Sequence, residues 1–342
     1  MLDFISRCVN STLCNFDKSP TPAILAFELF VLCGVVAALL VLPRLKDQIP
    51  KRFLLMSIGV LIFELFTAPM WHNFKMGWWA YIYRDVSWIL TLGWSAMMLS
   101  VVLIVDRIFK HWKEWKRFIL YLATLTVLVS FFETVVVNIG IRSYSPEVLA
   151  STSNITLLNV PIELIYYTPV FTTLVISFYK YWSFALDQTL LVPVKRSHWL
   201  RDFCIAFLGV FLFEMMIEPM VDNQNFPQWS YWFHDISIIM TGVWIVVIWL
   251  TTELMNRLLI HYSVAQKFLV TLLVIGAIAL PLESWFIIHG YRVYGPSAVA
   301  NFTGFTTPIT QVPVEVAFAI PCYMALVIGF IRYWETLLDN QL

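Results

Sequence analysis

Long apolar runs separated by short polar segments form the dominant pattern of the chain. A bilayer-spanning helix needs about 20 mostly apolar residues, and nine runs qualify, at 22–43, 53–71, 87–105, 118–140, 158–179, 203–221, 236–255, 268–288 and 312–331. Each is predicted to be an α-helix, because a bilayer satisfies no exposed backbone groups and the runs are too long for barrel strands. The pattern therefore predicts an all-α polytopic membrane protein with about nine transmembrane helices.

The composition agrees with this class and excludes others. Of 342 residues, 60% are hydrophobic and 13% are charged, whereas a soluble domain is about 45–50% apolar and about 25% charged. The 22 Lys and Arg balance the 22 Asp and Glu, and without a basic region no nucleic-acid partner is expected. The expected partners are the lipid bilayer and a hydrophobic small-molecule substrate, and the oligomeric state stays open.

Motifs for cofactors and metals are missing from the sequence. The five cysteines show no Cys-x-x-Cys or Cys/His spacing, and Cys8 and Cys14 fit either a disulfide or two thiols. The chain also has no glycine-rich phosphate loop, dinucleotide fingerprint or nucleophile elbow. We therefore expect no cofactor.

The distribution of Lys and Arg predicts the orientation. Most of them lie in the segments that follow the first, third, fifth, seventh and ninth runs. By the positive-inside rule, the N-terminus is outside or lumenal and the C-terminus is cytoplasmic, in a bacterial inner membrane or the endoplasmic reticulum. Three Asn-x-Ser/Thr sequons, which begin at Asn10, Asn154 and Asn301, fall on the predicted outer side.

The chain also repeats itself, at an offset of 150 residues. The matching pairs include Glu64/Glu214, Pro69/Pro219, Asn73/Asn223, Asp85/Asp235, Thr91/Thr241, Trp94/Trp244, Glu133/Glu283, Arg142/Arg292 and Tyr144/Tyr294. After a two-residue insertion, Val160-Pro161 and Glu163 recur as Val312-Pro313 and Glu315.

This repeat predicts the domain organisation. Residues 1–50 form an outer tail and the first helix, 51–184 form repeat 1, 185–201 form a cytoplasmic linker and 202–342 form repeat 2. Each repeat holds four spans, so both insert the same way up. We expect them to be related by a pseudo-two-fold axis along the membrane normal.

Eight carboxylates that recur in both repeats are the candidate catalytic residues. They are Glu64, Asp85, Glu133, Glu163, Glu214, Asp235, Glu283 and Glu315. Ionisable groups inside membrane spans are costly and indicate functional sites by default. The predicted topology places all eight in the outer half of the membrane, together with Glu28 of the first helix. Within each repeat, we expect three glutamates to border one cavity: Glu64, Glu133 and Glu163 in repeat 1, and Glu214, Glu283 and Glu315 in repeat 2.

At the positions where the two repeats differ, repeat 2 has more ionisable candidate residues than repeat 1. Ala68 corresponds to Glu218, one helical turn from Glu214, and Arg84 corresponds to His234. We therefore favour a reactive pocket in repeat 2. The candidate substrate-binding residues are Glu218, Arg142, Arg292, Tyr144, Tyr294, Trp94 and Trp244.

Structural roles stay open for the same residues. Arg142 and Arg292 also fit as neutralising partners of nearby glutamates. Asp85 and Asp235 also fit as helix N-caps, and the aromatic residues also fit as a belt at the membrane interface.

Buried carboxyl groups favour acid–base chemistry on a lipid-dissolved molecule. A neutral carboxyl group in apolar surroundings can protonate an alkene, an epoxide or a leaving group. A second carboxylate then removes a proton, which completes an isomerisation or cyclisation without a redox cofactor, and aromatic faces stabilise a passing carbocation. We expect Glu214 or Glu315 to be the general acid and Glu283 to be the proton acceptor.

One segment has a counterpart in a known family. Asn138-Ile-Gly-Ile-Arg-Ser-Tyr144, followed by Val160-Pro-Ile-Glu-Leu-Ile-Tyr-Tyr167, resembles the integral-membrane lycopene cyclase domain of carotenoid biosynthesis, and Val312-Pro-Val-Glu-Val316 is similar. That domain is typically duplicated and has a Pro-x-Glu-Glu motif that opens a helix. The resemblance covers roughly residues 133–182 and 283–334, and it implies that Glu163 and Glu315 are catalytic.

The chain departs from that family pattern in two ways. The second acid of the motif is Leu164 in one copy and Val316 in the other. Each repeat also has four spans rather than about three.

Three other classes fit parts of the sequence. Intramembrane acids, repeats and matching prolines are typical of a proton- or cation-coupled transporter, although the repeated acids lie toward one face. The acids of repeat 2, with His234 and His289, are the donor types of a metal-dependent membrane protein, although no Glu-x-x-His or His-x-x-x-His spacing occurs. A non-catalytic subunit of a membrane complex is the third.

Overall fold

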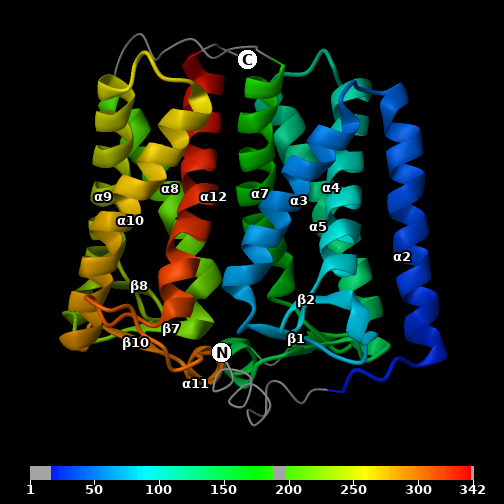
Figure 1. Cartoon of the computed structure of the whole chain (residues 1–342), viewed down its shortest axis with the longest axis horizontal. Helices are drawn as coiled ribbons and strands as arrows, with labels where there is room; N and C mark the ends of the chain where they lie inside the picture. The colour runs from blue at the N-terminus through cyan, green and yellow to red at the C-terminus, as the bar shows by residue number, and fades with distance from the viewer. Residues whose placement is uncertain (1–16, 154, 188–197, 340–342) are drawn as a thin grey trace. The chain divides into compact units, whose positions relative to one another are not determined.

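The computed structural model describes residues 17–153, 155–187 and 198–339. The chain folds into two compact units that divide between Tyr179 and Lys180. In each unit, long helices run side by side and short strands gather at one end of them, which we call the strand end (Figure 1). Outside the described residues lie Cys8, Cys14, Asn10, Asn154 and most of the predicted linker 185–201.

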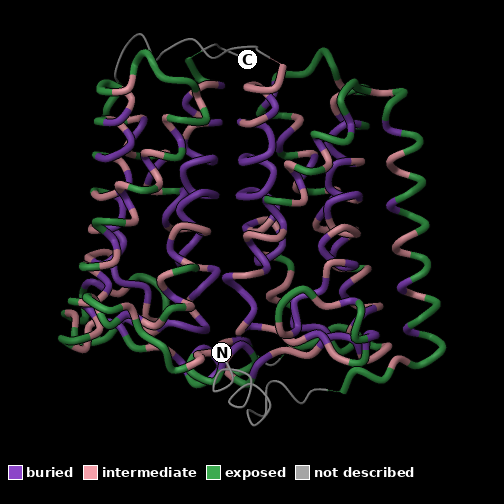
Figure 2. The backbone as a smooth tube through the Cα atoms, in the orientation of Figure 1, coloured by how far each residue is buried: buried purple, intermediate pink, exposed green. Residues whose placement is uncertain are grey.

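Among the described residues, the first unit is built on five long helices. They are α2 (Pro22–Val41), α3 (Ile49–Thr67), α4 (Trp88–Ile108), α5 (Glu114–Asn138) and α7 (Leu164–Leu186), the last of which continues into the second unit. Shorter turns are η1 (Leu42–Arg44), η2 (Trp78–Ala80) and α6 (Pro146–Ser151). Helix α2 is largely exposed, whereas α4 is largely buried (Figure 2).

The described part of the second unit has four long helices of its own. They are α8 (Trp199–Ile217), α9 (Ile238–Leu258), α10 (Val264–Ile288) and α12 (Val314–Asp339), with the shorter turns η3 (Glu218–Met220), η4 (Gln228–Ser230) and α11 (Pro296–Ala300).

Two- and three-residue strands pair into antiparallel ladders at the strand end. In the first unit these are β1 (Trp71–Asn73) with β4 (Arg142–Tyr144), β2 (Tyr81–Tyr83) with β3 (Val86–Ser87), and β5 (Thr156–Leu157) with β6 (Val160–Pro161). In the second unit β7 (Val221–Asn223) pairs with β10 (Arg292–Tyr294), and β8 (Tyr231–Phe233) pairs with β9 (Ile236–Ser237). The all-α prediction did not include these strands.

Seven of the described helices are long and apolar enough to cross a membrane. They are α2, α4, α5, α8, α9, α10 and α12. The two other predicted spans form helices as well, α3 and α7. Helix α3 carries Lys51, Arg52 and Glu64, and α7 is rich in Tyr and Thr and carries Lys180, so both are less apolar. The count of nine spans stays a prediction.

Serine side chains cap the helices that follow the β2–β3 and β8–β9 turns. Ser87 Oγ accepts a hydrogen bond from Leu90 N at 3.5 Å, and Ser237 Oγ accepts one from Ile239 N at 3.3 Å. Because these hydroxyls occupy the N-cap position of α4 and α9, Asp85 and Asp235 lie in the preceding turns and are free for other contacts.

Glycines allow close helix packing within the second unit. A Cβ atom at Gly209 on α8 would lie 3.0 Å from Phe330 Cδ1 and 3.5 Å from Val327 Cγ1 on α12, whereas one at Gly276 on α10 would meet nothing within 4 Å. We predict that Gly209→Leu lowers the free energy of unfolding by about 1–3 kcal/mol through overpacking, and that Gly276→Leu does not. Thermal unfolding in detergent measures the difference, and equal effects of both variants would contradict this packing.

Candidate functional site

A buried arginine joins two strands and a helix end in the first unit. The β1–β4 register places Asn73 opposite Arg142, and Arg142 Nε donates to Asn73 Oδ1 at 3.1 Å. Arg142 Nη1 lies 3.2 Å from Glu133 Oε2 on α5, and Tyr144 OH donates to Glu133 Oε1 at 2.9 Å. The carboxylate of Glu133 is 2% exposed, so these donors replace the water that it has lost.

Asn73 extends the network to the turn between β2 and β3. Its side-chain amide donates to Asp85 O at 2.9 Å, and Asp85 Oδ2 lies 2.8 Å from His72 Nδ1. Asp85, Asn73 and Arg142 are all buried. The network therefore connects Asp85 to Glu133 through Asn73 and Arg142.

The second unit has corresponding contacts, with residue numbers raised by 150. Tyr294 OH donates to Glu283, Arg292 Nε lies 3.5 Å from Glu283 Oε1, and Asn223 Nδ2 donates to Asp235 O at 3.1 Å.

Burial and neighbouring charges shift the pKa values of Arg292 and Tyr294 in the second network. Burial lowers the pKa of Arg292, but the charge of Glu283 holds that pKa above its usual value. Burial and the Glu283 carboxylate raise the pKa of Tyr294 well above its usual value. The arginine therefore stays charged, and the phenol stays a hydrogen-bond donor.

Glu64 and Glu214 occupy a different environment, beside a threonine hydroxyl. Thr91 on α4 contacts Glu64 Oε2 on α3, and Thr241 on α9 contacts Glu214 Oε2 on α8. The same hydroxyls lie 2.9 Å from Ser87 O and 3.0 Å from Ser237 O. Both carboxyl groups are buried, and in the part of the chain that the structure describes Glu214 Oε1 has no hydrogen-bond partner.

The two units differ around the histidine. In the first unit His72 faces Asp85, whereas in the second unit His234 Nδ1 lies 2.9 Å from Glu218 Oε1. Asp235 Oδ2 instead accepts a hydrogen bond from Asn223 N at 2.9 Å. Burial and the charges of Glu218 and Asp222 raise the pKa of Asp235 to about 6.

Glu163 and Glu315 lie apart from these networks. Glu163 Oε1 accepts a hydrogen bond from Ser153 N at 2.7 Å, and Glu315 Oε1 accepts one from Thr303 N at 2.7 Å. Among the described residues, no hydrogen bond or ion pair connects Glu163 to Glu133, or Glu315 to Glu283. Each of these glutamates therefore binds a backbone amide in the loop that precedes its helix.

The two tryptophan candidates have different surroundings. Trp94 lines an apolar pocket between helices of the first unit, whereas Trp244 is 4% exposed and packs edge-on against Phe286 at 6.2 Å.

Buried acids also occur at the helix ends opposite the strands, which the sequence interpretation did not anticipate. Glu114, Asp202 and Glu335 are 3–5% exposed. Each has an arginine within three residues as an ion-pair partner: Arg117, Arg201 and Arg332, respectively. Local arginines therefore allow further acids, which are not among the repeated carboxylates, to be buried at the opposite end of the helices.

Sequence reasoning underrated Asn73, Asn223, Thr91 and Thr241. Their recurrence at the offset of 150 was the available signal, but Asn and Thr carry no charge that would draw attention inside a span. Among the described residues, no group of three His, Cys, Asp or Glu side chains is arranged to hold a metal ion.

Comparisons with protein-family models, with characterised proteins and with solved structures found no match to this chain. The chemistry of the site is therefore argued from its own geometry.

The Arg292–Glu283 pair gives a direct stability test. We predict that Arg292→Gln costs about 3–5 kcal/mol of unfolding free energy, because it leaves a buried carboxylate without its partner. The double variant Arg292→Gln/Glu283→Gln recovers much of that loss. Arg257→Gln, which breaks the exposed pair with Glu253, costs under about 1 kcal/mol. Chemical unfolding in detergent checks all three, and a single variant no worse than the double would contradict the pairing.

The pKa of Asp235 predicts a pH dependence of stability. Because burial raises this pKa to about 6, the folded state prefers the neutral acid, and stability falls as the pH rises from the ordinary value of Asp through about 6. We predict that Asp235→Asn makes this fall smaller, by the part that Asp235 contributes. Asp222→Asn shifts it to lower pH, because it removes a neighbouring negative charge. Melting temperatures across this pH range measure both, and parallel curves for wild type and Asp235→Asn would refute the assignment.

Proposed function

We propose that the chain is an integral-membrane enzyme that performs acid–base chemistry, an isomerisation or cyclisation, on a hydrophobic isoprenoid or lipid substrate. The reactive carboxyl groups lie at the strand end of two tandem four-helix repeats. Glu64 and Glu214 are the proton donors of the two units, and Glu133 and Glu283 are the proton acceptors.

The position of the threonine hydroxyls carries this proposal. A hydroxyl has one proton to donate, yet Thr241 Oγ1 contacts both Ser237 O and Glu214 Oε2. The carbonyl oxygen can only accept. If Glu214 is a neutral acid, its O–H donates to Thr241 and the threonine donates to Ser237 O, so both contacts are satisfied. Thr91, Ser87 and Glu64 form the same arrangement, which supports a carboxyl group that holds a proton ready for transfer.

The proposed proton acceptors, Glu133 and Glu283, lie beside arginines rather than beside threonines. Arg142 Nη1 lies 3.2 Å from Glu133 Oε2, and Arg292 Nε lies 3.5 Å from Glu283 Oε1. Two carboxyl groups with different partners, a threonine hydroxyl for one and a guanidinium group for the other, are typical of acid–base pairs.

The reaction that these groups support balances without an oxidant. The neutral acid protonates a carbon–carbon double bond, which gives a carbocation and a carboxylate. The second carboxylate then removes a proton from an adjacent carbon and restores a double bond, so the product is an isomer of the substrate. The resemblance of residues 133–182 and 283–334 to the lycopene cyclase domain supports an isoprenoid substrate. The proposal departs from it in the reactive residues, because Glu163 and Glu315 accept hydrogen bonds from the backbone amides of Ser153 and Thr303.

The orientation that we propose puts the strand end outside or in the lumen, with nine spans, an external N-terminus and a cytoplasmic C-terminus. The positive-inside rule supports it, because Lys and Arg are concentrated in the segments opposite the strands.

Carboxamide variants test the proposed donors. We predict that Glu64→Gln/Glu214→Gln lowers turnover by at least about 10², because Gln keeps the shape but has no transferable acid proton. The single variants show which unit is active. Glu253→Gln, which changes an acid on α9 away from the site, retains turnover. Purified protein in lipid nanodiscs is incubated with linear polyprenols and polyenes, and isomeric products are measured by chromatography with mass detection.

Thermal unfolding of each variant keeps loss of folding separate from loss of chemistry. Full turnover in the folded double variant would refute the acid assignment. Substrate flux that collapses with the proton gradient, without any isomeric product, would favour a transporter instead.

A further inference from the structure

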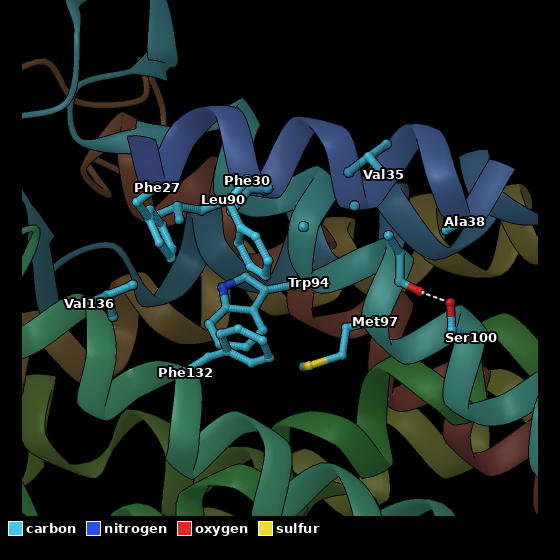
Figure 3. A pocket seen from close by; sticks show the side chains of 14 residues that line it. Phe27, Phe30, Val35, Ala38, Leu90, Trp94, Met97, Ser100, Phe132 and Val136 are labelled. Carbon is cyan, nitrogen blue, oxygen red and sulfur yellow. Dashed lines mark hydrogen bonds between the residues drawn. The ribbon is translucent and has the colours of Figure 1, made fainter. Parts of the chain in front are cut away.

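An apolar pocket of about 220 Å³ lies in the first unit between α2, α4 and α5. Figure 3 shows its two ends: Phe27, Phe30, Trp94 and Phe132 gather at one, and Val35, Ala38 and Met97 lie toward the other. Along α2 and α4 the lower residue numbers are nearer the strands. The aromatic end therefore faces the strand end, and the aliphatic end points toward the middle of the helices.

Contacts at the strand end hold α2 in place. Glu28 Oε1 accepts a hydrogen bond from Gly77 N, and its Oε2 accepts one from Trp79 Nε1, both at 3.1 Å. Glu28 is 4% exposed. Both oxygens of this buried carboxyl group therefore serve to attach the apolar helix α2 to Gly77 and Trp79. The position of α2, and with it one wall of the pocket, is thus fixed from one end.

Two glycines set the width of the pocket. A Cβ atom at Gly93 on α4 would lie 2.7 Å from Val31 Cγ1, so the two helices meet closely there. A Cβ atom at Gly34, one turn further along α2, would meet nothing within 4 Å. Helix α2 therefore contacts α4 near the strand end and leaves open space beyond it.

The pocket offers almost no polar partner to a ligand. Ser100 Oγ already donates to Ala96 O at 2.6 Å. Phe30 lines the pocket and is 60% exposed, so the pocket opens on the side of α2 that faces outward. In a bilayer the surrounding medium is hydrocarbon, and an apolar cavity of about 150 Å³ already suffices to bind benzene.

We propose that this pocket binds one hydrocarbon chain, prenyl or acyl, of a molecule dissolved in the bilayer. The aromatic end holds the chain segment nearest the strand end. The site is a feature of the first unit, because α2 precedes the segment that recurs at the offset of 150 and Trp244, the counterpart of Trp94, packs against Phe286 instead. Binding of the chain does not depend on the acid–base reaction.

Photolabelling of the full chain in phosphatidylcholine nanodiscs tests the site. Two probes are used, a farnesol analogue and a palmitate analogue, each with a diazirine in the chain, and labelled peptides are identified by mass spectrometry. We expect adducts on α2 and α4 at the pocket residues. Labelling by farnesol alone identifies a prenyl site, labelling by palmitate alone an acyl site, and labelling by both a general chain site.

Gly34→Leu adds a side chain to the pocket wall at a position where a Cβ atom meets nothing within 4 Å, and it is expected to lower this labelling about tenfold. Gly242→Leu is the matched control, because a Cβ atom there also meets nothing within 4 Å and the residue lies in α9, away from the pocket; it leaves labelling unchanged. Labelling that persists in folded Gly34→Leu, or that is no greater than on the lipid-exposed face of α10, would overturn the proposal. Because no turnover is measured, either result is distinct from failure of the proposed reaction.

Discussion

A charge buried among apolar helices must find a partner, and the Arg–Glu pair at the end of α5 and of α10 meets this constraint in each unit. The glutamate is on the helix and the arginine is on the strand that follows it, so the chain must turn back at this point. Strand pairing then places Asn73 against Arg142. Asn73 in turn holds the β2–β3 turn through Asp85. Helix α4 begins directly after that turn, so the turn also positions Thr91, which contacts Glu64.

The helices were the predictable part of the fold. The run at 87–105 became α4 (Trp88–Ile108), and the run at 268–288 became most of α10 (Val264–Ile288), because a span of about 20 apolar residues has no other stable form in a bilayer. The strands were not predictable. Three-residue strands are too short to show a period of two, and β1 pairs with β4, a segment about 70 residues further along the chain.

The site was predictable in its residues but not in its contacts. Recurrence at an offset of 150 pointed to Glu64, Glu133 and Glu163 alike. The structure separates them by partner: a threonine hydroxyl, an arginine with a tyrosine, and a backbone amide. Sequence spacing carries no information on which side chain turns toward which neighbour. The difference in partners is what distinguishes a proton donor from a proton acceptor in the proposed reaction.

The central claim is that carboxyl groups transfer protons to and from carbon, and isotope labelling tests it most directly. Wild-type protein in nanodiscs is incubated with linear polyprenols and polyenes in deuterium oxide, and the product is examined by mass spectrometry. The account predicts an isomeric product that carries deuterium at the protonated carbon and is unchanged in oxidation state. An isomeric product without deuterium at carbon, or a product of altered oxidation state, would contradict it.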